Sequence, residues 1–569
     1  MIKGIAASSG IAIAKAMKKE VVKMEIEERA IENIDAEKAR FSAAIEQSKM
    51  EIEALVKSTK ENIGESEAQV FEAHLMILED PEVASRVDSK LAEEKLCVEH
   101  IYKVVTDEFI DMFMQIPDEY LRERAHDLQD VRDRVLRNLL GIKLKDFSNL
   151  GEETIIIARD LTPSDTASLD KKYAIGFVTE IGGSTSHSAI MARTLEIPAV
   201  VGTIDVLSHV NDGDMVIIDG DEGIVILSPS GEEVEKYQKL RAERNEFKKA
   251  LEKMIGKSSE TLDGHSVELA ANIGSPNDLD GVLKYDSEGV GLYRTEFLYM
   301  DNTAWPTEDE QFEAYKKVAQ GLDGKPVVIR TLDIGGDKEL SYYDLPEEMN
   351  PFLGYRAIRL CLDQKDIFKT QLRAIFRASA FGNIRIMFPM ISSVEELRAA
   401  KAVVNEVKAE LKAESIEYDD STQIGMMIEI PAAAVISDLL AKEVDFFSLG
   451  TNDLIQYTAA VDRMNSKIAH LYNPFHPAII RLINTVIQNG HKEGIWVGMC
   501  GETAGNPLLV PLFLAMGLDE FSMSPSSILR ARHIIRNSSK QELEKHLDEI
   551  LSLSTAEEIK KAVEEKFVL

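Results

Sequence analysis

The feature that most constrains the fold is a series of eight short apolar segments in the C-terminal half of the chain. They are residues 267–273, 289–297, 326–335, 384–390, 424–431, 444–453, 496–505 and 520–525. Helical patterns separate them, for example at 308–320, 393–412 and 477–490. Eight strands alternating with helices over about 300 residues are typical of a (β/α)8 TIM barrel, with a doubly wound open sheet as the alternative. We expect the barrel, over residues 259–569.

Charged and polar side chains fall at the ends of these expected strands. They are Arg294, Arg330, Glu429, Asn452, Asp453, Arg463 and Cys500. Either fold would use the carboxyl ends of its strands as the active face. A structural network of arginines and carboxylates is the alternative explanation. A functional site is favoured because so many such groups occupy corresponding positions.

The residue types at these strand ends indicate a particular chemistry. Glu429 and Asp453 would lie on neighbouring strands, and paired carboxylate oxygens suit Mg²⁺ better than zinc or copper. Several arginines on one face suit an anionic, phosphorylated substrate, because the guanidinium fork matches phosphate oxygens. The sequence therefore predicts a magnesium site beside a phosphate-binding site.

A second informative segment, GGSTSHSAIMARTLEIPAVVG at residues 182–202, places His187 where a helix is expected to begin. The free N–H groups and partial positive charge of a helix N-terminus suit a phosphoryl group carried on that imidazole. The alternative is a capping turn whose histidine only packs.

The rest of the chain divides by its hydrophobic pattern. Residues 22–142 are helical in pattern and are expected to form a four-helix bundle. The bundle would be inserted into a β/α domain made of residues 1–21 and 143–229. That domain contains expected strands at 154–158, 173–180, 198–202 and 214–220. Residues 230–258 are long, charged and helical, which is typical of an exposed linker helix.

Composition excludes several classes of protein. The formal net charge of −33 disfavours binding to nucleic acid. The three cysteines, Cys97, Cys361 and Cys500, are too few and too widely spaced for a disulfide framework or a structural zinc site. The N-terminus reads as a strand rather than a signal peptide, and no apolar run approaches the ~18 residues of a membrane span. We expect a cytoplasmic protein.

Four segments carry a resemblance to a known family. They are 182–202, DFFSLGTNDLIQYTAAVDR (445–463), NPFLGYRAIR (350–359) and GMCGE (498–502). The chain resembles, end to end, the phosphoenolpyruvate-utilising enzymes, and among them the enzyme I group of bacterial sugar phosphotransferase systems. The resemblance implies transfer of the phosphoryl group of phosphoenolpyruvate to His187 with release of pyruvate. The group would then pass to a histidine of the phosphocarrier protein HPr. A homodimer formed through the barrel is also implied.

The resemblance assigns roles residue by residue. His187 would be the phosphorylated residue, and Cys500 would protonate the enolate. Glu429 and Asp453 would ligate Mg²⁺, and Thr166 would hydrogen-bond the imidazole. The substrate-binding residues would be Arg294, Arg330, Arg356, Asn452 and Arg463. The helical insertion would dock HPr, with His74, Met76 and Ile77 as candidates for that surface.

Three other functions are weighed against this one. A dikinase or synthase of the same superfamily would carry an additional ATP-grasp domain, for which we expect no segment to remain. A nitrogen-regulatory relative would carry an extra sensor domain. The third alternative is a regulatory scaffold that has the same folds but no activity. The sequence argues against it, because it contains all of His187, Glu429, Asp453 and Cys500.

Overall fold

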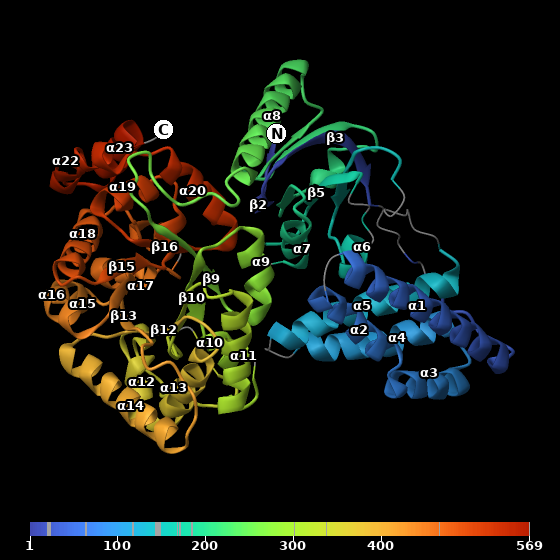
Figure 1. Cartoon of the computed structure of the whole chain (residues 1–569). Coiled ribbons are helices and arrows are strands. Elements are labelled where there is room, and N and C mark those ends of the chain that lie inside the picture. Colours follow the sequence, from blue (N-terminus) through green and yellow to red (C-terminus); the bar gives the residue numbers. More distant parts are fainter. Residues whose placement is uncertain are drawn as a thin grey trace. The chain divides into compact units, whose positions relative to one another are not determined.

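The computed structural model folds as two units, Met1–Phe247 and Lys248–Leu569, which meet within helix α8 (Gly231–Glu252) (Figure 1). It describes all residues except 20–23, 25, 63–64, 116–118, 143–149, 168, 170–171, 184–185, 301, 337, 339, 466 and 568–569. None of the helices formed by the described residues combines the length and the apolar character that a membrane span requires.

The C-terminal unit is a closed barrel of eight parallel strands, which confirms the predicted TIM barrel and excludes the open sheet. The strands pair in the order β10-β11-β12-β13-β14-β15-β16-β9. Their bounds are β9 (Glu268–Ile273), β10 (Gly289–Arg294), β11 (Val327–Arg330), β12 (Ile384–Phe388), β13 (Ile424–Ile428), β14 (Phe446–Leu449), β15 (Trp496–Met499) and β16 (Glu520–Met523). Each strand lies within one of the eight apolar segments of the sequence.

Helices surround the barrel (Figure 1). Their apolar faces are buried against its outer surface. They are α9 (Leu279–Lys284), α10 (Glu296–Met300), α11 (Glu308–Gly321), α12 (Ile358–Asp363), α13 (Lys365–Ser379), α14 (Val394–Ala413), α15 (Pro431–Val435), α16 (Ser437–Leu440), α17 (Thr451–Ala459), α18 (Pro477–Lys492), α19 (Leu509–Met516), α20 (Ile528–Arg536), α21 (Lys540–Glu544), α22 (Leu547–Ser552) and α23 (Ala556–Phe567). Local signals fix where they begin. Thr307 and Glu310, for example, form a capping box at the start of α11.

Side chains of alternate strand residues fill the inside of the barrel. The inward-facing apolar cluster comprises Leu292, Val328, Met387, Met427, Phe446, Cys500 and the partly buried Trp496. The rings of Phe446 and Trp496 stack with centroids 4.4 Å apart and planes 7° from parallel. The barrel is thus a packed core rather than a pore, as its strand number requires.

One ionisable group, Glu520, lies within this interior. Both of its carboxyl oxygens are buried and lack a hydrogen-bond partner. Glycines leave the space that it fills, because a β-carbon added to Gly291 or Gly498 would lie 1.8 Å or 2.1 Å from those oxygens. Burial, and next the charge of Glu268, raise the pKa of Glu520 to about 8, while Arg385 opposes the rise. The carboxyl group is therefore mostly protonated at neutral pH.

The N-terminal unit contains an eight-stranded sheet in the order β1-β8-β7-β3-β4-β5-β6-β2. The bounds are β1 (Ile2–Lys3), β2 (Ile5–Ser8), β3 (Ile11–Lys18), β4 (Thr154–Ala158), β5 (Ala174–Thr179), β6 (Ala199–Val201), β7 (Met215–Asp219) and β8 (Ile224–Leu227). Strands β3 to β6 run parallel, and the remaining pairs are antiparallel. The predicted strands are all present, and the N-terminal segment enters the sheet as expected. The short α6 (Pro163–Ala167) and α7 (His187–Leu195) follow β4 and β5.

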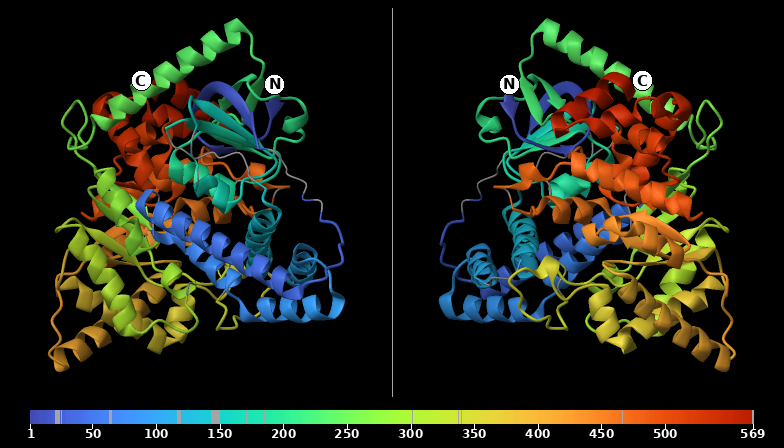
Figure 2. Two further views of the ribbon diagram at one scale, coloured as in Figure 1. Left: turned by 90° about the vertical axis from the view of Figure 1, so that its right-hand side faces the viewer. Right: turned by 90° about the vertical axis from the view of Figure 1, so that its left-hand side faces the viewer.

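The inserted segment is helical as predicted, with five helices among its described residues where four were expected. They are α1 (Ile34–Asn62), α2 (Glu65–Leu78), α3 (Pro81–Glu94), α4 (Val98–Met114) and α5 (Glu119–Leu140), which pack side by side in Figures 1 and 2. The extra helix is α3, which begins just after Asp80. The Asp80 side chain caps it by accepting from the Glu82 N–H, and Pro81 occupies its first position.

Helix α8 forms over most of the predicted linker, but it is not exposed along its whole length. Tyr237 is buried and packs with Ile217 of β7 and Ile226 of β8. The first turns of α8 therefore belong to the N-terminal unit, because an aromatic ring facing the sheet gains stability by its burial.

Glu520 makes the stability of the barrel depend on pH. The pKa of Glu520 is about 8 in the folded chain, against an ordinary value of 4.5. The protonated carboxyl group therefore contributes fully to the free energy of unfolding below pH 4.5, and this contribution is lost progressively as the pH rises to 8. Between pH 5 and pH 8, the free energy of unfolding of the wild type should fall more than that of Glu520→Gln. The expected difference is on the order of a few kcal/mol. Denaturant titrations of both proteins at each pH measure it, and equal pH slopes would contradict it.

Candidate active site

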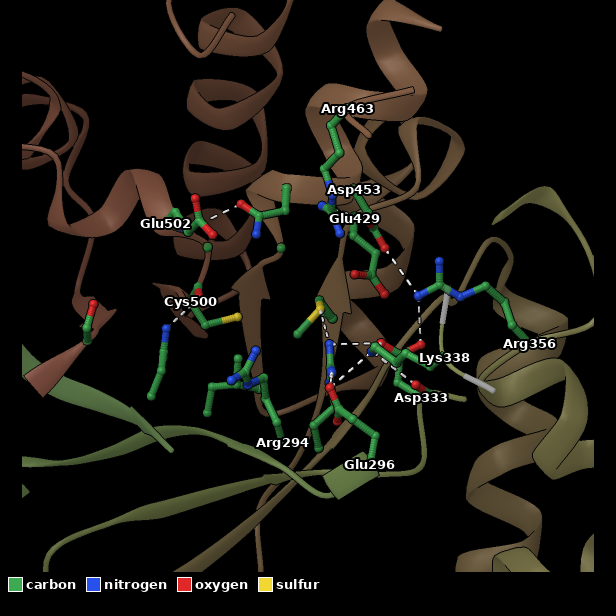
Figure 3. Close-up of a pocket in the computed structure, with 18 of the residues that line it drawn as sticks. Arg294, Glu296, Asp333, Lys338, Arg356, Glu429, Asp453, Arg463, Cys500 and Glu502 are labelled. Carbon is green, nitrogen blue, oxygen red and sulfur yellow. Dashed lines mark hydrogen bonds and ion pairs between the residues drawn. The ribbon is translucent and has the colours of Figure 1, made fainter. Parts of the chain in front are cut away.

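A cavity of about 500 Å³ opens at the carboxyl ends of the barrel strands (Figure 3). The structure brings together there every barrel residue that the sequence analysis selected for the site. They are Arg294, Arg330, Arg356, Glu429, Asn452, Asp453, Arg463 and Cys500. The barrel joins them because the carboxyl ends of all its strands meet at one rim.

A buried network of charges lies at one side of this cavity, with Asp333 at its centre. Asp333 accepts from Arg356 Nη2 and Lys338 Nζ, both at 2.8 Å, and Arg330 Nη1 lies 3.1 Å from it. Glu296 accepts from Arg330 Nη2 at 2.7 Å and from Lys338 Nζ at 3.0 Å. Burial alone would raise the pKa of Asp333, but the three cations hold it well below its ordinary value. Burial would likewise raise the pKa of Glu296, but Arg330 and Lys338 lower it below its ordinary value, so both carboxylates stay ionised.

The same network holds two guanidinium groups in fixed positions without using all their donors. The Nε atoms of Arg330 and Arg356 are buried and lack a hydrogen-bond partner. Burial lowers the pKa of each arginine, and the neighbouring carboxylates more than reverse this, so both remain charged. A third arginine, Arg294, is exposed at the cavity, with its guanidinium 4.7 Å from the centre of the Phe297 ring. Such an arrangement can bind an anion with several oxygens.

Two carboxylates at the next strand ends are the candidate metal ligands. Glu429 follows β13, and its Oε1 accepts from the Met390 N–H at 2.6 Å. Burial, followed by the charges of Asp453 and Asp333, raises the pKa of Glu429 to about 8. Asp453 lies 3.4 Å from Arg356 Nη2 and 3.3 Å from Arg463 Nη1. Over the described part of the chain, no group of three or more His, Cys, Asp or Glu side chains is arranged to hold a metal ion.

Asn452 and Arg463 belong to the segment that leaves β14. Asn452 lies in the first turn of α17, and its Oδ1 accepts weakly from Tyr472 Oη and from the Glu502 N–H, each at 3.4 Å. The backbone N–H of Arg463 donates to Gln456 Oε1 at 3.3 Å. Contacts from Tyr472 and Glu502, outside the segment, therefore help to position Asn452 at the cavity.

Cys500 lies at the end of β15 and is buried at the cavity floor. Burial raises the pKa of its thiol to about 12, although the nearby Ser448 hydroxyl and Arg330 lower it. The sulfur contacts the Leu449 carbonyl oxygen at 3.9 Å. The group is therefore a thiol at neutral pH and holds a proton that it could donate.

The N-terminal unit carries the two residues predicted to act in phosphoryl transfer outside the barrel, His187 and Thr166. Helix α7 begins at His187 as predicted, with Ser186 as its N-cap accepting from the Ala189 N–H at 3.4 Å. The side chain of His187 lies outside the described part of the structure. Thr166 is buried in α6, and its hydroxyl donates to the Thr162 carbonyl oxygen at 3.2 Å.

Sequence reasoning missed several residues that line the cavity. They are Asn272, Glu296, Lys338, Tyr472 and Glu502. A signal existed for two of them: Glu296 stands two residues after Arg294, and Lys338 follows Asp333 in a glycine-containing loop. Pairing each of them with the correct opposite charge required the closed barrel.

Comparison with known proteins identifies the family. The sequence profile described as "PEP-utilising enzyme, PEP-binding domain" matches residues 248–540, and those of the N-terminal and mobile domains match residues 3–124 and 150–223. The phosphoenolpyruvate-protein phosphotransferase of Priestia megaterium is 54% identical, covering 100% of this chain and 99% of its own. The chain belongs to the phosphoenolpyruvate-protein phosphotransferase family. Its membership confirms the predicted resemblance and makes it an enzyme.

Two further members of the phosphoenolpyruvate-protein phosphotransferase family, from Geobacillus stearothermophilus and Bacillus subtilis, are 53% and 52% identical. They cover 100% of this chain and 98% and 99% of their own lengths. A solution structure titled Enzyme I (nEIt) is 44% identical and covers 43% of this chain and 100% of its own, with a TM-score of 0.40. Similarity over the full length of the relatives favours a phosphotransferase of this family over a dikinase.

The charge network predicts a large penalty for removing its central anion. Asp333→Ala would leave Arg330, Arg356 and Lys338 without their shared partner, which should reduce the free energy of unfolding by about 3–5 kcal/mol. Asp309→Ala is the matched control, because Asp309 pairs with Arg377 at the surface and should cost less than about 1 kcal/mol. Denaturant unfolding measures both, and equal losses would contradict the prediction.

Proposed function

We propose that the chain transfers the phosphoryl group of phosphoenolpyruvate to its own His187 and then to a histidine of the phosphocarrier protein HPr. The observation that carries this proposal is the convergence of arginines and two carboxylates on one cavity. The four arginines are Arg294, Arg330, Arg356 and Arg463. Phosphoryl transfer depends on positioning and charge neutralisation, which a fixed array of cations supplies.

Substrate binding follows from the charges around the cavity. Arg330 and Arg356 are already held in place by Asp333, so they lose little freedom when they bind the phosphate and carboxylate groups. Arg294 and Arg463 would complete the anion site from the rim, and the Asn452 amide would donate a further hydrogen bond. The enolate produced by P–O cleavage would then take a proton from the Cys500 thiol.

The family depends in general on a metal ion, and we propose Mg²⁺ held by Glu429 and Asp453. Glu429 is buried beside Asp453, and its raised pKa reflects a site where negative charge lacks sufficient compensation. Two protein carboxylates suit Mg²⁺, which completes its octahedron with water and substrate oxygens. When bound, this ion would neutralise charge on the phosphoryl group and the enolate.

The acceptor chemistry is assigned to the start of α7. His187 must attack as a neutral imidazole, so transfer should weaken as pH falls through its pKa. The N-terminus of a nine-residue helix then favours the negative charge of the phosphorylated ring. Thr166 would orient the imidazole and select its tautomer.

One histidine must serve both the cavity and a separate protein, so we propose that the phosphohistidine domain moves about residues 230–258. In this proposal, residues 1–21 with 143–229 would carry the histidine and residues 22–142 would dock HPr. Residues 230–258 would link the units, and residues 259–569 would bind phosphoenolpyruvate and form the homodimer. The boundary between the two units lies within α8, which is consistent with this arrangement.

The proposed HPr surface needs one correction. His74 is buried, and its ring lies 3.3 Å from Asp127 Oδ1, so it packs within the bundle rather than facing a partner. Met76 is 76% exposed and remains a candidate, while Ile77 is partly buried. A negatively charged chain would attract a carrier with a basic face. We also propose a cytoplasmic location, since the three cysteines are free.

The proposed function makes a direct prediction for His187. After incubation with phosphoenolpyruvate and Mg²⁺, mass spectrometry should find one acid-labile phosphate within residues 182–193, and His187→Ala should carry none. HPr phosphorylation by this variant should fall by at least about 10³-fold, because the nucleophile is gone. His209→Ala, which changes an exposed histidine of the same unit, is the control and should behave as the wild type. Normal charging of HPr by His187→Ala would contradict the proposal.

The metal assignment has a separate test that does not depend on turnover. Millimolar Mg²⁺ should raise the Tm of the wild type, because a ligand that binds only the folded chain stabilises it. Glu429→Gln and Asp453→Asn should each lose most of that increase. Glu502→Gln, which changes another carboxylate at the same cavity, should keep it. Equal Mg²⁺-dependent shifts in all four proteins would exclude these ligands.

A further inference from the structure

Beneath the floor of the cavity, the barrel interior holds polar groups that phosphoryl transfer does not use. Gly498 of β15 pairs with Glu520 of β16. Two residues further along the same parallel pair, Cys500 and Ser522 are therefore neighbours on the inner face. Ser448 projects inward from β14, on the other side of β15. The thiol thus lies between two hydroxyl-bearing strands, with the Glu520 carboxyl group one layer below.

The carboxyl group of Glu520 is confined to this layer. Its oxygens occupy the spaces left by Gly291 and Gly498, and both are buried without a hydrogen-bond partner. Gly291 has no side chain, and the position that its β-carbon would take lies 2.6 Å from Ser522 Oγ as well as close to a Glu520 oxygen. The Ser522 hydroxyl and the Glu520 carboxyl group therefore both face this space. The raised pKa of Glu520 keeps a proton on the group at neutral pH.

Two hydroxyl groups lie close to the ends of the path between this layer and the thiol, Ser448 near the thiol and Ser522 near the Glu520 carboxyl group. Ser448 is close enough to Cys500 to lower the pKa of the thiol, yet its buried Oγ makes no well-formed hydrogen bond. Ser522 Oγ donates to Asn272 Oδ1 at 2.6 Å, and Asn272 Nδ2 donates to the Cys500 carbonyl oxygen at 2.9 Å. Because a hydroxyl can accept one proton while it donates another, it can pass a proton between an acid and a thiolate.

The proposed role of Cys500 creates a need for such a supply. When the thiol protonates the enolate, the S–H bond breaks, a C–H bond forms at C3, and a buried thiolate remains. Substrate in the cavity displaces water from the side on which the thiol meets solvent. Each further turnover requires a new proton on the sulfur.

We propose that Glu520 resupplies the proton that Cys500 gives to the enolate. In this step the O–H bond of Glu520 breaks, the proton passes through the Ser448 or Ser522 hydroxyl, and the S–H bond forms again. The resulting Glu520 carboxylate takes its next proton from solvent. The inference rests on the proposed function of Cys500 and assigns to Glu520 a role that it performs through that thiol.

The opposite mouth of the barrel offers the entry for that proton. Glu268, the first residue of β9, pairs with Glu520, and its side chain is 32% exposed. Burial, opposed by Arg385, raises the pKa of Glu268. Arg385 lies 4.0 Å from Glu268 and stacks over Trp496, with 4.8 Å between its guanidinium carbon and the ring centre. Glu268 therefore faces solvent on one side and Glu520 on the other.

The test compares the rate of the first turnover with the steady-state rate in the variant Glu520→Gln. This substitution keeps the shape of the side chain but removes its acidic proton. Rapid-quench phosphorylation of the chain by phosphoenolpyruvate with Mg²⁺ should match the wild type within about twofold. Steady-state formation of pyruvate, with HPr as acceptor, should fall at least about tenfold, because the proton supply is lost. In Glu520→Gln, the ultraviolet absorbance of a thiolate should accumulate after the first turnover. The double variant Glu520→Gln, Cys500→Ala should not show it.

The matched control is Glu288→Gln at the same end of the barrel. Glu288 accepts from the Leu269 N–H and Ser259 Oγ outside the interior, so this variant should keep both rates and show no thiolate. A general loss of folding would instead slow the first turnover and the following ones together, and would overturn the proposal. If Glu520→Gln showed wild-type steady-state rates and a normal first turnover, the proposed proton supply from Glu520 would be overturned, and the role of Cys500 would stand. Unchanged pyruvate release by Cys500→Ala would overturn both the proton supply from Glu520 and the proposed role of the thiol.

Discussion

The active cavity depends on one buried carboxylate, Asp333, and the three cations that surround it. Removing four charged groups from water is costly, and the cost is offset only because each cation meets an oxygen at hydrogen-bonding distance. Asp333 holds Arg330 and Arg356 in place before substrate arrives, so that the positions of their charges are set by the fold. The network is thus both a structural element of the barrel mouth and the base of the proposed anion site.

Two buried glutamates show how the environment divides the roles of chemically identical groups. Burial raises the pKa of both Glu429 and Glu520 to about 8. Glu429 lies at the carboxyl end of its strand beside Asp453, where a divalent cation would favour its ionised form. Glu520 lies inside the barrel, away from the arginines of the cavity, where burial favours the protonated form at neutral pH. One side chain is therefore suited to bind a metal, and the other to hold a proton.

The division of the chain into two units agrees with the division of the proposed reaction. The barrel supplies fixed charges, and the N-terminal unit supplies the helix start at His187, the proposed carrier of the phosphoryl group. Tyr237 attaches the first turns of α8 to the sheet, so a movable joint would lie beyond them. In the proposed reaction, separating nucleophile and substrate site in this way would let one histidine meet two partners in turn.

The sequence by itself determined the barrel, the position of its active face and the start of the helix at His187. These features follow from local signals: short apolar runs, helical hydrophobic patterns and the polar residues at strand ends. Only the tertiary structure decided the central place of Asp333, the partners Glu296 and Lys338, and the burial of Glu520. The inward position of His74 was also decided there. Such features depend on which side chains meet across a closed barrel or a bundle, and contacts between distant segments leave no periodic trace in the sequence.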